Sequence, residues 1–498
     1  KLGRRRSHGG GAPVNRPIRQ LVAVIAVMFL GLAGSTTAIQ FFQAASLNAN
    51  AWNVRTLYRE YGTQRGPIIV AGESIVSSQP IDDAYNYLRV YERPEIYSNL
   101  TGYYSIAHNS MTGLERAMNP VLGGSDSSLA GQRIEELITG SQPQGGGVEL
   151  TIDPQLQEAA AAALGNQRGA VVVLNSRTGD ILAQVSTPGF DPNGVATHDT
   201  AAARENYQAL EADPTTPLID RATGGDQYAP GSSFKLLTAT AMIENLGLTP
   251  DSLVEAPRTF VPPGTTHDMW NPGQAACGDG SGQVKLTEAF AQSCNTPFAI
   301  GGIKVGPEKM VAQAEKFGFN SELATPLPVS ASRFPAPEDA AALAMDSIGQ
   351  RDIRVTPMQM AMVGAAIAND GVVMKPNLVR RTLTADLEPV SESEPEVLSR
   401  AMSQQTAGYM HQMMVDEVKH GTGYLFTLPG IETSGKTGTA EITNDIPPHA
   451  WFVGNATIGD TAYTVAVIVE NSGNAVWNGD GGSVAAPLAR TVLEAKVN

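Results

Sequence analysis

The sequence contains few cysteines and histidines: two and seven among 498 residues. Structural zinc sites and iron–sulfur clusters need closely spaced sets of these residues, which the sequence lacks, so no metal site is predicted. Charged residues are also scarce, at 17% against a usual share of about 25%. Acidic residues outnumber basic ones by 49 to 34, and the resulting net charge of −15 argues against a nucleic-acid partner.

The N-terminal part of the chain has no acidic residue before Glu60, and six basic residues lie in its first 19 positions. An uncharged run follows over residues 21–42, and a helix needs about 20 such residues to cross a bilayer. We therefore expect a cytoplasmic tail over residues 1–20, one transmembrane anchor over 21–42, and an extracytoplasmic chain beyond it. A cleaved signal peptide is the alternative, because small residues at Ser35–Ala38 and Ala44–Ser46 are typical of cleavage sites.

The chain is long enough for two to four domains of roughly 150 residues each. A glycine-rich stretch, Ser141–Gly147, predicts a boundary between a smaller domain over 43–147 and a larger one over 148–498. The larger domain is expected to open with a strand over Val148–Ile152 and a helix over Gln155–Leu164 that Asp153 caps.

The strand pattern predicts a single sheet in the larger domain. Two candidate strands lie near its start and three near its end, with a helical region between them. The expected fold class is α/β, of the α+β type, with a five-stranded sheet and a helical lobe. The predicted strands are Gly169–Leu174, Asp180–Ser186, Thr433–Ile442, Ala450–Ile458 and Ala462–Glu470, and helices are predicted over Ser399–His420 and Ser483–Val497.

A turn followed by a helix contains the first candidate catalytic residues. Pro230 and Gly231 predict the turn, and the helix is expected from Ser232 to about Leu246. Ser232 and Lys235 are three residues apart, so their side chains share one helical face. A lysine that burial keeps neutral can remove the proton of a serine hydroxyl, and a helix N-terminus stabilises an oxyanion. The alternative is an N-cap serine beside a surface lysine, which describes most S-x-x-K matches.

Two further motifs follow in order along the chain. The first is Ser293–Asn295, of the form S-x-N, and the second is K-T-G-T on the predicted strand Thr433–Ile442. No G-x-S-x-G motif is present and no histidine is placed as a triad base, which argues against a Ser-His-Asp hydrolase. The motifs add these candidate site residues: Ser293, Asn295, Lys436, Thr437, Gly438 and Thr439.

An S-x-x-K, S-x-N and K-T-G set in this order is the signature of the penicillin-binding and serine β-lactamase superfamily. The chain resembles class B penicillin-binding proteins over essentially its whole length, and most of all the actinobacterial penicillin-binding protein A group. Arg55–Ile68 and Gly113–Gly124 resemble the family's non-catalytic pedestal domain. Segments between the motifs that match family patterns are Val148–Gln157, Val171–Asn193, Ser347–Gln350, Val355–Ala361, His420–Gly423 and His449–Gly454.

Two segments depart from the family pattern. Arg351 follows Ser347–Gln350 where a third glycine is expected, which bears on the geometry of a loop near the site. Ile69–Ala71 replaces the usual Asp-Arg of the pedestal, which weakens any inference about a partner surface there.

The resemblance implies a serine-type D-Ala-D-Ala transpeptidase that crosslinks peptidoglycan stem peptides, releases D-alanine and is acylated by β-lactams. Ser232 is expected to attack, Lys235 to take its proton, and Ser293 with Lys436 to pass the proton to the departing D-alanine. Asn295, Thr437, Gly438 and Thr439 are expected to bind substrate, with the backbone N–H groups of Ser232 and Thr439 as the oxyanion hole. No cofactor is expected.

Two alternatives to a transpeptidase remain open. A D,D-carboxypeptidase or β-lactamase uses the same chemistry but admits water to the acyl-enzyme. A receptor or division scaffold would bind β-lactams or membrane proteins of division and cell-wall synthesis without turnover. The segment over 43–147 is too short for an added glycosyltransferase domain.

Three smaller features complete the expectations. Asn471–Gly482 is predicted to be a long loop near the active site that narrows access as a lid does, with a simple surface connection as the alternative. His449, Trp451 and the pair Met413–Met414 are expected to be packing residues. Glu115 and Arg116 are expected to form either a charged cluster in the pedestal or a solvated surface pair.

The two cysteines predict a disulfide bond. Cys294 is the middle residue of the S-x-N motif, and Cys277 precedes a glycine-rich stretch that can fold back onto it. Because the domain is expected outside the membrane, where thiols oxidise, a Cys277–Cys294 bond is favoured over two buried thiols. A bond beside Ser293 is expected to restrain the hydroxyl that passes protons.

Overall fold

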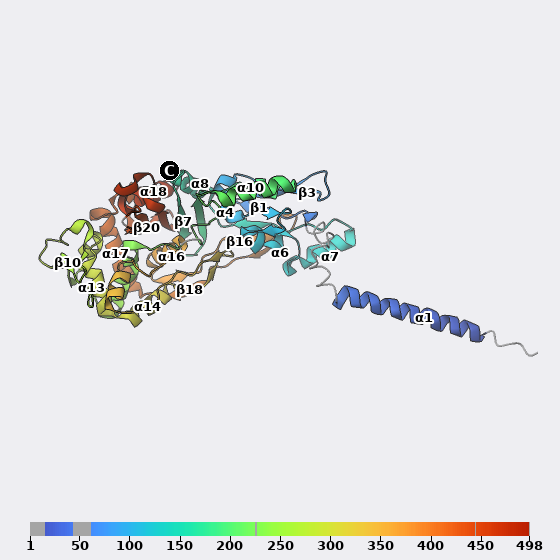
Figure 1. Ribbon diagram of the computed structural model, residues 1–498, viewed down its shortest axis with the longest axis horizontal. Helices are drawn as coiled ribbons and strands as arrows, with labels where there is room; N and C mark the ends of the chain where they lie inside the picture. Colours follow the sequence, from blue (N-terminus) through green and yellow to red (C-terminus); the bar gives the residue numbers. More distant parts are fainter. Residues whose placement is uncertain (1–14, 43–60, 225–226, 444, 498) are drawn as a thin grey trace, which may run out of the picture. The chain divides into compact units, whose positions relative to one another are not determined.

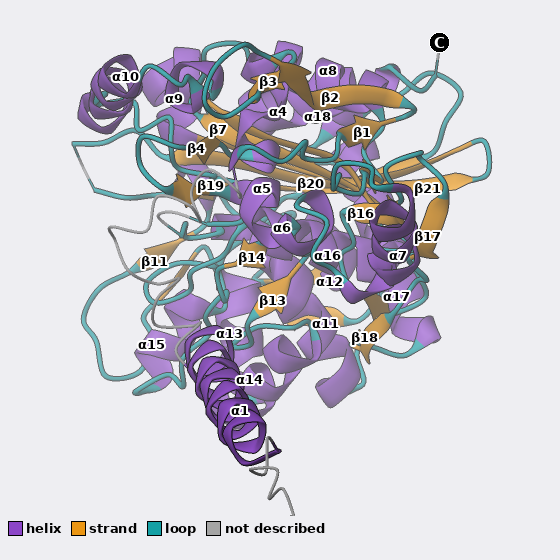
Figure 2. Ribbon diagram, turned by 90° about the vertical axis from the view of Figure 1, so that its right-hand side faces the viewer, coloured by secondary structure: helices purple, strands orange, loops and turns teal. Residues whose placement is uncertain are grey.

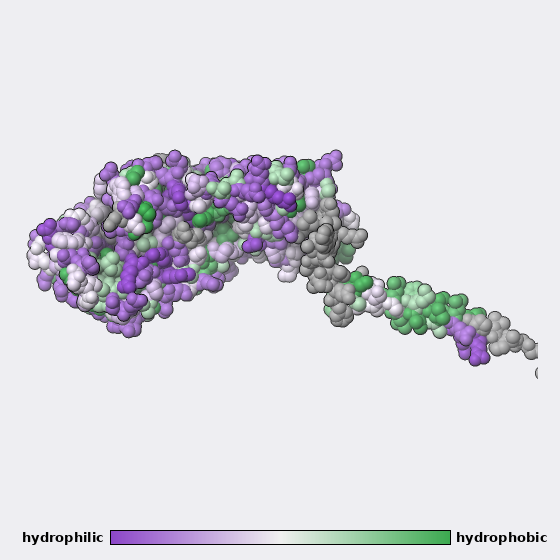
Figure 3. Space-filling view, viewed as in Figure 1, coloured by the Kyte–Doolittle hydropathy of each residue, from purple (hydrophilic) through white to green (hydrophobic). Residues whose placement is uncertain are grey.

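The computed structural model describes residues 15–42, 61–224, 227–443 and 445–497, and divides into two compact units, 1–62 and 63–498. The first unit contains helix α1 (Asn15–Thr37) and a π-helical turn, η1 (Ala38–Phe42). Its stretch Ile18–Thr37 has a mean hydropathy of 1.9 and is long enough to span a membrane, and Figure 3 shows hydrophobic residues along it. The length and polarity fit a single-pass anchor, whereas most of the basic tail lies outside the described residues.

The second unit contains the predicted five-stranded sheet. Its order is β19-β20-β21-β7-β8 and every neighbouring pair is antiparallel, so two strands from early and three from late in the sequence form one sheet. The α/β fold class is confirmed. The strands are β7 (Gly169–Asn175), β8 (Ile181–Thr187), β19 (Thr433–Ala440), β20 (His449–Ile458) and β21 (Thr461–Val469).

Helices cover both faces of this sheet, as Figure 2 shows. Helices α8 (Pro154–Leu164) and α18 (Ala486–Glu494) pack on one face, and α16 (Pro357–Ala368) packs on the other. Asp153 begins α8 by accepting hydrogen bonds from two backbone N–H groups of its first turn. Because both faces are covered, the central strands are apolar on both sides.

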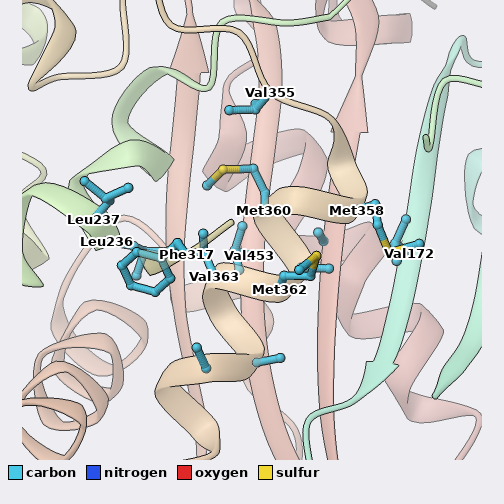
Figure 4. Close-up of a cluster of buried hydrophobic side chains, with 14 of the residues drawn as sticks. Val172, Leu236, Leu237, Phe317, Val355, Met358, Met360, Met362, Val363 and Val453 are labelled. Carbon is cyan, nitrogen blue, oxygen red and sulfur yellow. The ribbon is translucent and has the colours of Figure 1, made fainter. Parts of the chain in front are cut away.

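Helix α16 lies at the centre of the molecule's main core. It is apolar on every side, and nearly all of its residues are buried. Figure 4 shows its methionines and Val363 near the sheet residue Val453, with Leu236 and Leu237 of helix α11 (Lys235–Leu246) on one side and the sheet residue Val172 on the other. The core therefore fixes α11, which carries Lys235, against the sheet that carries the K-T-G motif.

A second sheet joins strands from both sides of residue 147. Its order is β17-β16-β6-β1-β2-β3, and β6 pairs with β1 on one edge and with β16 on the other. The expected pedestal is thus continuous with strands from the larger domain (Figure 1). The strands are β1 (Ile68–Val70), β2 (Glu73–Pro80), β3 (Tyr87–Tyr91), β6 (Val148–Leu150), β16 (Val379–Leu383) and β17 (Pro389–Glu392).

Glu115 anchors the part of the structure around β1 and β3. It is fully buried and forms ion pairs with Arg65 at 2.9 Å and Arg89 at 2.6 Å. Burial by itself would raise the pKa of Glu115, but Arg89 and Arg65 lower it below its ordinary value. The expected charged cluster is thus present at Glu115, but its partners are Arg65 and Arg89. The inclusion of Arg116 is wrong, because that residue is exposed.

Two predicted helix starts are wrong. The helix expected over Ser399–His420 is α17 (Gln404–His420), because Val397–Arg400 forms strand β18 and Ser403 caps the helix. The last helix starts at Ala486 and not Ser483, since Gly481–Ala485 forms a π-helical turn, η7, that Asp480 caps. In both cases the position of a capping side chain, and not the spacing of apolar residues, determines where the helical segment begins.

The other described elements lie outside the two main sheets. The helices and helical turns are α4 (Pro94–Thr101), α5 (Gly113–Ala117), α6 (Asn119–Leu122), η2 (Ser127–Leu129), α7 (Ala130–Thr139), α9 (Asn193–Ala196), α10 (Thr200–Ala212), η3 (Gly231–Phe234), η4 (Pro272–Gln274), α12 (Leu286–Ala291), α13 (Thr296–Val305), α14 (Pro307–Lys316), α15 (Ala340–Asp346), η5 (Tyr424–Phe426) and η6 (Glu470–Asn478). The strands are β4 (Tyr104–Ser105), β5 (Ser110–Met111), β9 (Leu253–Glu255), β10 (Thr259–Phe260), β11 (Met269–Trp270), β12 (Gln283–Lys285), β13 (Leu323–Ala324), β14 (Pro328–Val329) and β15 (Val372–Met374).

Candidate active site

Ser232 lies in the helical turn η3, directly before α11. Gly231 has a φ of 54°, and its N–H donates to the carbonyl of Gly349 at 2.9 Å. A Cβ atom at Gly231 would lie only 2.4 Å from the carbonyl oxygen of Thr439. Only glycine therefore fits this position, and its absent side chain lets the serine turn approach strand β19.

The side chain of Lys235 is fully buried beneath Ser232. Its Nζ atom lies 3.0 Å from the hydroxyl of Ser232, and 2.7 Å from both the carbonyl of Ser293 and Oδ1 of Asn295. Burial, and then the positive charge of Lys436, lower the pKa of Lys235 well below its ordinary value. The two carbonyl groups can only accept hydrogen bonds, so when the amine of Lys235 is neutral they take both of its hydrogens and leave its lone pair for Ser232.

Asn295 is fixed on both sides of its amide. Its Oδ1 atom accepts from Lys235, its Nδ2 group donates to the carbonyl of Trp270 at 2.8 Å, and its backbone N–H donates to Asn271. Ser293 has a φ of 55°, in the left-handed region, and its hydroxyl forms no hydrogen bond within the described residues. The S-x-N segment thus presents a carbonyl to Lys235, and no described residue forms a hydrogen bond with the serine hydroxyl.

The structure contains a disulfide bond between Cys277 and Cys294, and both residues are buried. It links the segment after the η4 turn to the middle of the S-x-N motif. The residue that follows the unusual backbone of Ser293 is therefore covalently anchored.

Lys436 lies on β19 and, like Lys235, has no exposed surface. Its Nζ atom forms an ion pair with Oε1 of Glu417 at 3.2 Å and lies 3.3 Å from the carbonyl of Thr437. Burial lowers the pKa of Lys436, and Glu417 opposes that shift. Among the described residues, the expected hydrogen bond between Lys436 and Ser293 is not formed. The ammonium group of Lys436 pairs with Glu417 instead.

Sequence reasoning missed Glu417, although the sequence carries a signal for it. On α17 the buried residues Met410, Met413, Met414 and Val418 follow helical spacing, and Glu417 falls on the same stripe. A charged residue on an otherwise apolar stripe needs a partner of opposite charge. The methionine pair itself lies in the core, as expected.

Gly438 and Thr439 bring β19 against the serine turn. A Cβ atom at Gly438 would lie 2.8 Å from the carbonyl oxygen of Pro230, so glycine permits this approach. The backbone N–H of Gly481 lies 3.4 Å from Oγ1 of Thr439, which places the end of the segment over residues 471–482 beside the motif.

Trp451 is buried and its indole N–H donates to the carbonyl of Ala229 at 3.1 Å, which agrees with a packing role.

Arg351, which stands where the family pattern has glycine, adopts the left-handed backbone conformation that favours glycine. Its φ is 63°, and its side chain pairs with Glu338 and Asp352.

Asp346, the last residue of α15, has no exposed surface, and its Oδ2 atom has no hydrogen-bond partner within the described residues. Burial is the main cause that raises the pKa of Asp346 to about 7.

Comparison with known proteins places this geometry in a family. Residues 169–494 match the family model described as "Penicillin binding protein transpeptidase domain". The chain belongs to the penicillin-binding protein transpeptidase family. Residues 65–148 match a second model, "Penicillin binding protein A dimerisation domain". The class B resemblance inferred from the motifs is confirmed.

Similar proteins extend over nearly the whole chain. "Peptidoglycan D,D-transpeptidase PbpA" of Mycolicibacterium smegmatis is 42% identical over 97% of this chain and 99% of the relative. The protein of that name from Mycobacterium tuberculosis is 39% identical with the same coverage. A solved structure of penicillin-binding protein A from M. tuberculosis, a ceftriaxone acyl-enzyme complex, matches with a TM-score of 0.83 at 40% identity, over 89% of this chain and 100% of that one. A penicillin G acyl-enzyme complex of the same protein matches with a TM-score of 0.82.

Proposed function

We propose that Ser232 is the nucleophile and Lys235 the general base of this peptidoglycan D,D-transpeptidase. The observation that carries the assignment is the hydrogen-bond arrangement of Lys235, whose amine contacts two carbonyl groups and the Ser232 hydroxyl. When that amine is neutral, its lone pair is left for Ser232. Ser232 attacks the carbonyl of the penultimate D-alanine as its proton passes to Lys235. The peptide C–N bond breaks, D-alanine leaves with a proton, and an amine of a second stem peptide then displaces the serine to form the crosslink.

The remaining motif residues bind and orient the substrate in this proposal. The backbone N–H groups of Ser232 and Thr439 stabilise the oxyanion. Lys436, Thr437 and Thr439 hold the terminal carboxylate along β19, where Gly438 allows close approach of the serine turn. Ser293 passes a proton to the leaving amine once its unpartnered hydroxyl turns toward the site.

We also infer the arrangement of the chain about the membrane. A cytoplasmic tail over 1–20 and an anchor over 21–42 leave the pedestal over 43–147 and the transpeptidase domain over 148–498 outside. The excess of basic residues before the span supports this orientation. Membrane proteins of cell division or cell-wall synthesis are the partners expected for the pedestal.

The deciding experiment follows the fate of the acyl-enzyme. The purified full-length protein is incubated with a peptide ending in D-alanyl-D-alanine and a D-amino-acid acceptor. A transpeptidase forms the acceptor-linked product, a carboxypeptidase forms the hydrolysed peptide, and a receptor forms neither. Predominant hydrolysis at saturating acceptor would contradict the proposal.

A further inference from the structure

Glu417 is a buried carboxylate that collects donors from the K-T-G motif. Its Oε1 atom accepts from the backbone N–H and the hydroxyl of Thr437, both at 3.0 Å, and from the hydroxyl of Thr422 at 2.8 Å. The ammonium group of Lys436 lies 3.2 Å from the same oxygen. Neither member of this ion pair has exposed surface, so water does not screen the pair.

The two buried lysines of the site have opposite surroundings. Lys235 faces a hydroxyl and two carbonyl groups, all uncharged. Lys436 faces a carboxylate. The positive charge of Lys436 lowers the pKa of Lys235, so a proton on both lysines is unfavourable in this buried site, and the carboxylate of Glu417 favours the proton on Lys436.

We propose that Glu417 is a positioning residue that keeps Lys436 the charged lysine of the pair and thereby leaves Lys235 free to act as the base. This inference rests on the proposed roles of Ser232 and Lys235. Glu417 itself does not touch the reacting atoms. It acts through Lys436, whose positive charge disfavours a second proton on Lys235 and is available for the carboxylate of the substrate.

Removal of the charge at residue 417 is expected to change the pKa of Lys235 in a definite direction. Burial and the charge of Lys436 lower the pKa of Lys235, whereas burial lowers the pKa of Lys436 and Glu417 raises it. The titratable groups concerned are therefore Lys235, Lys436 and Glu417. In Glu417→Gln, Lys436 loses its proton more easily, and the positive charge that lowers the pKa of Lys235 disappears. The pKa of Lys235 then rises, and the rising limb of acylation rate against pH moves upward by about one pH unit or more.

The test measures the second-order rate constant of acylation by a fluorescent penicillin as a function of pH, on the full-length protein in detergent. Glu417→Gln is expected to move the acid limb upward, which lowers the rate on that limb about tenfold per pH unit moved. Glu417→Asp keeps the charge on a shorter side chain, and its limb is expected between wild type and Glu417→Gln. Glu432→Gln removes an exposed carboxylate that pairs with Lys419 of α17, and its profile is expected to match wild type.

A limb that stays in place in Glu417→Gln would overturn the proposal, even if the rate fell equally at every pH, because an equal fall indicates a structural role. If Glu417→Gln does not fold, Glu417→Asp decides by the same criterion. A wild-type chain that is acylated but forms no crosslinked product would contradict the proposed function and leave the role of Glu417 in acylation intact.

Discussion

The amine of Lys235 lies 3.0 Å from the hydroxyl of Ser232, one helical turn away, and no other hydroxyl in the described structure shares that amine. The two residues sit on opposite sides of the junction between η3 and α11, so the same short segment sets both positions. Substitution of either residue is therefore expected to impair acylation.

Ser232→Ala is expected to abolish covalent labelling by a fluorescent penicillin, because it removes the one hydroxyl that contacts the amine of Lys235 within the described residues. The measurement is fluorescence of the denatured protein on a gel. Ser125→Ala, on the surface of the pedestal, should be labelled like wild type. Labelling of the Ser232 variant at the wild-type rate would show that another residue is acylated.

Lys235→Arg should lower the acylation rate about 10²–10⁴-fold, because a guanidinium stays protonated and does not act as a base. The wild-type rate rises with pH as Lys235 loses its proton, and its lowered pKa places that rise far below the ordinary lysine value of 10.5. Wild type is therefore expected to reach its plateau well below pH 10.5. Lys304→Arg, at an exposed position, serves as the control. A wild-type rate still climbing at strongly alkaline pH would show that Lys235 is charged at neutral pH.

The Cys277→Ser, Cys294→Ser double variant is expected to be less stable by about 3 kcal/mol, since the bond closes a loop between residues 17 apart. Thermal melting, before and after reduction, measures the difference, and reductant should not affect the double variant. Its acylation rate should also change, because Cys294 adjoins Ser293. A native acylation rate would mean that the bond stabilises the fold without restraining the site.

Asp346→Asn should stabilise the protein at neutral pH. Since burial raises the pKa of Asp346 to about 7, the unfolded chain releases this proton at lower pH than the folded one. Wild-type stability therefore falls from about pH 4 to about pH 7 relative to the variant, and the difference is constant above that range. Melting temperature against pH tests this, with Asp386→Asn on an exposed turn as the control. A pH-independent difference would contradict the assignment.

Replacement of residues 474–477 by one glycine is expected to raise the acylation rate, since the segment around them contacts the K-T-G strand. Gly481 lies so close that a Cβ atom there would approach the carbonyl of Gly438 to 2.5 Å. Three residues of this segment other than glycine, Asn471, Ser472 and Val476, have φ values of 51–55°, the kind of backbone strain found at functional segments. Trp477, which is 56% exposed, is the side chain removed. An unchanged rate would favour a plain surface connection.

The local elements of this protein follow from its sequence. The spacing of Ser232 and Lys235 by itself places both on one helical face, and Pro154 after Asp153 starts α8 where expected. The five strands are recognisable because each is a short apolar run between turn residues. Their assembly into one sheet is indicated by their position at the two ends of one domain, whereas their order within the sheet comes from the structure alone.

Only the tertiary structure decided which charges meet. Glu417 and Lys436 are 19 residues apart, and Glu115 is 50 residues from Arg65 and 26 from Arg89, so no local spacing predicts these pairs. The burial of Lys235 also depends on tertiary structure. The sequence shows only that residue 235 is a lysine, which is charged in water, and water is excluded from it only when α16, α11 and the sheet pack together. The sequence by itself determined the three motifs and the helical spacing of Ser232 and Lys235, whereas long-range packing determined the surroundings of the two buried lysines, because desolvation and ion pairing depend on every element that surrounds the site.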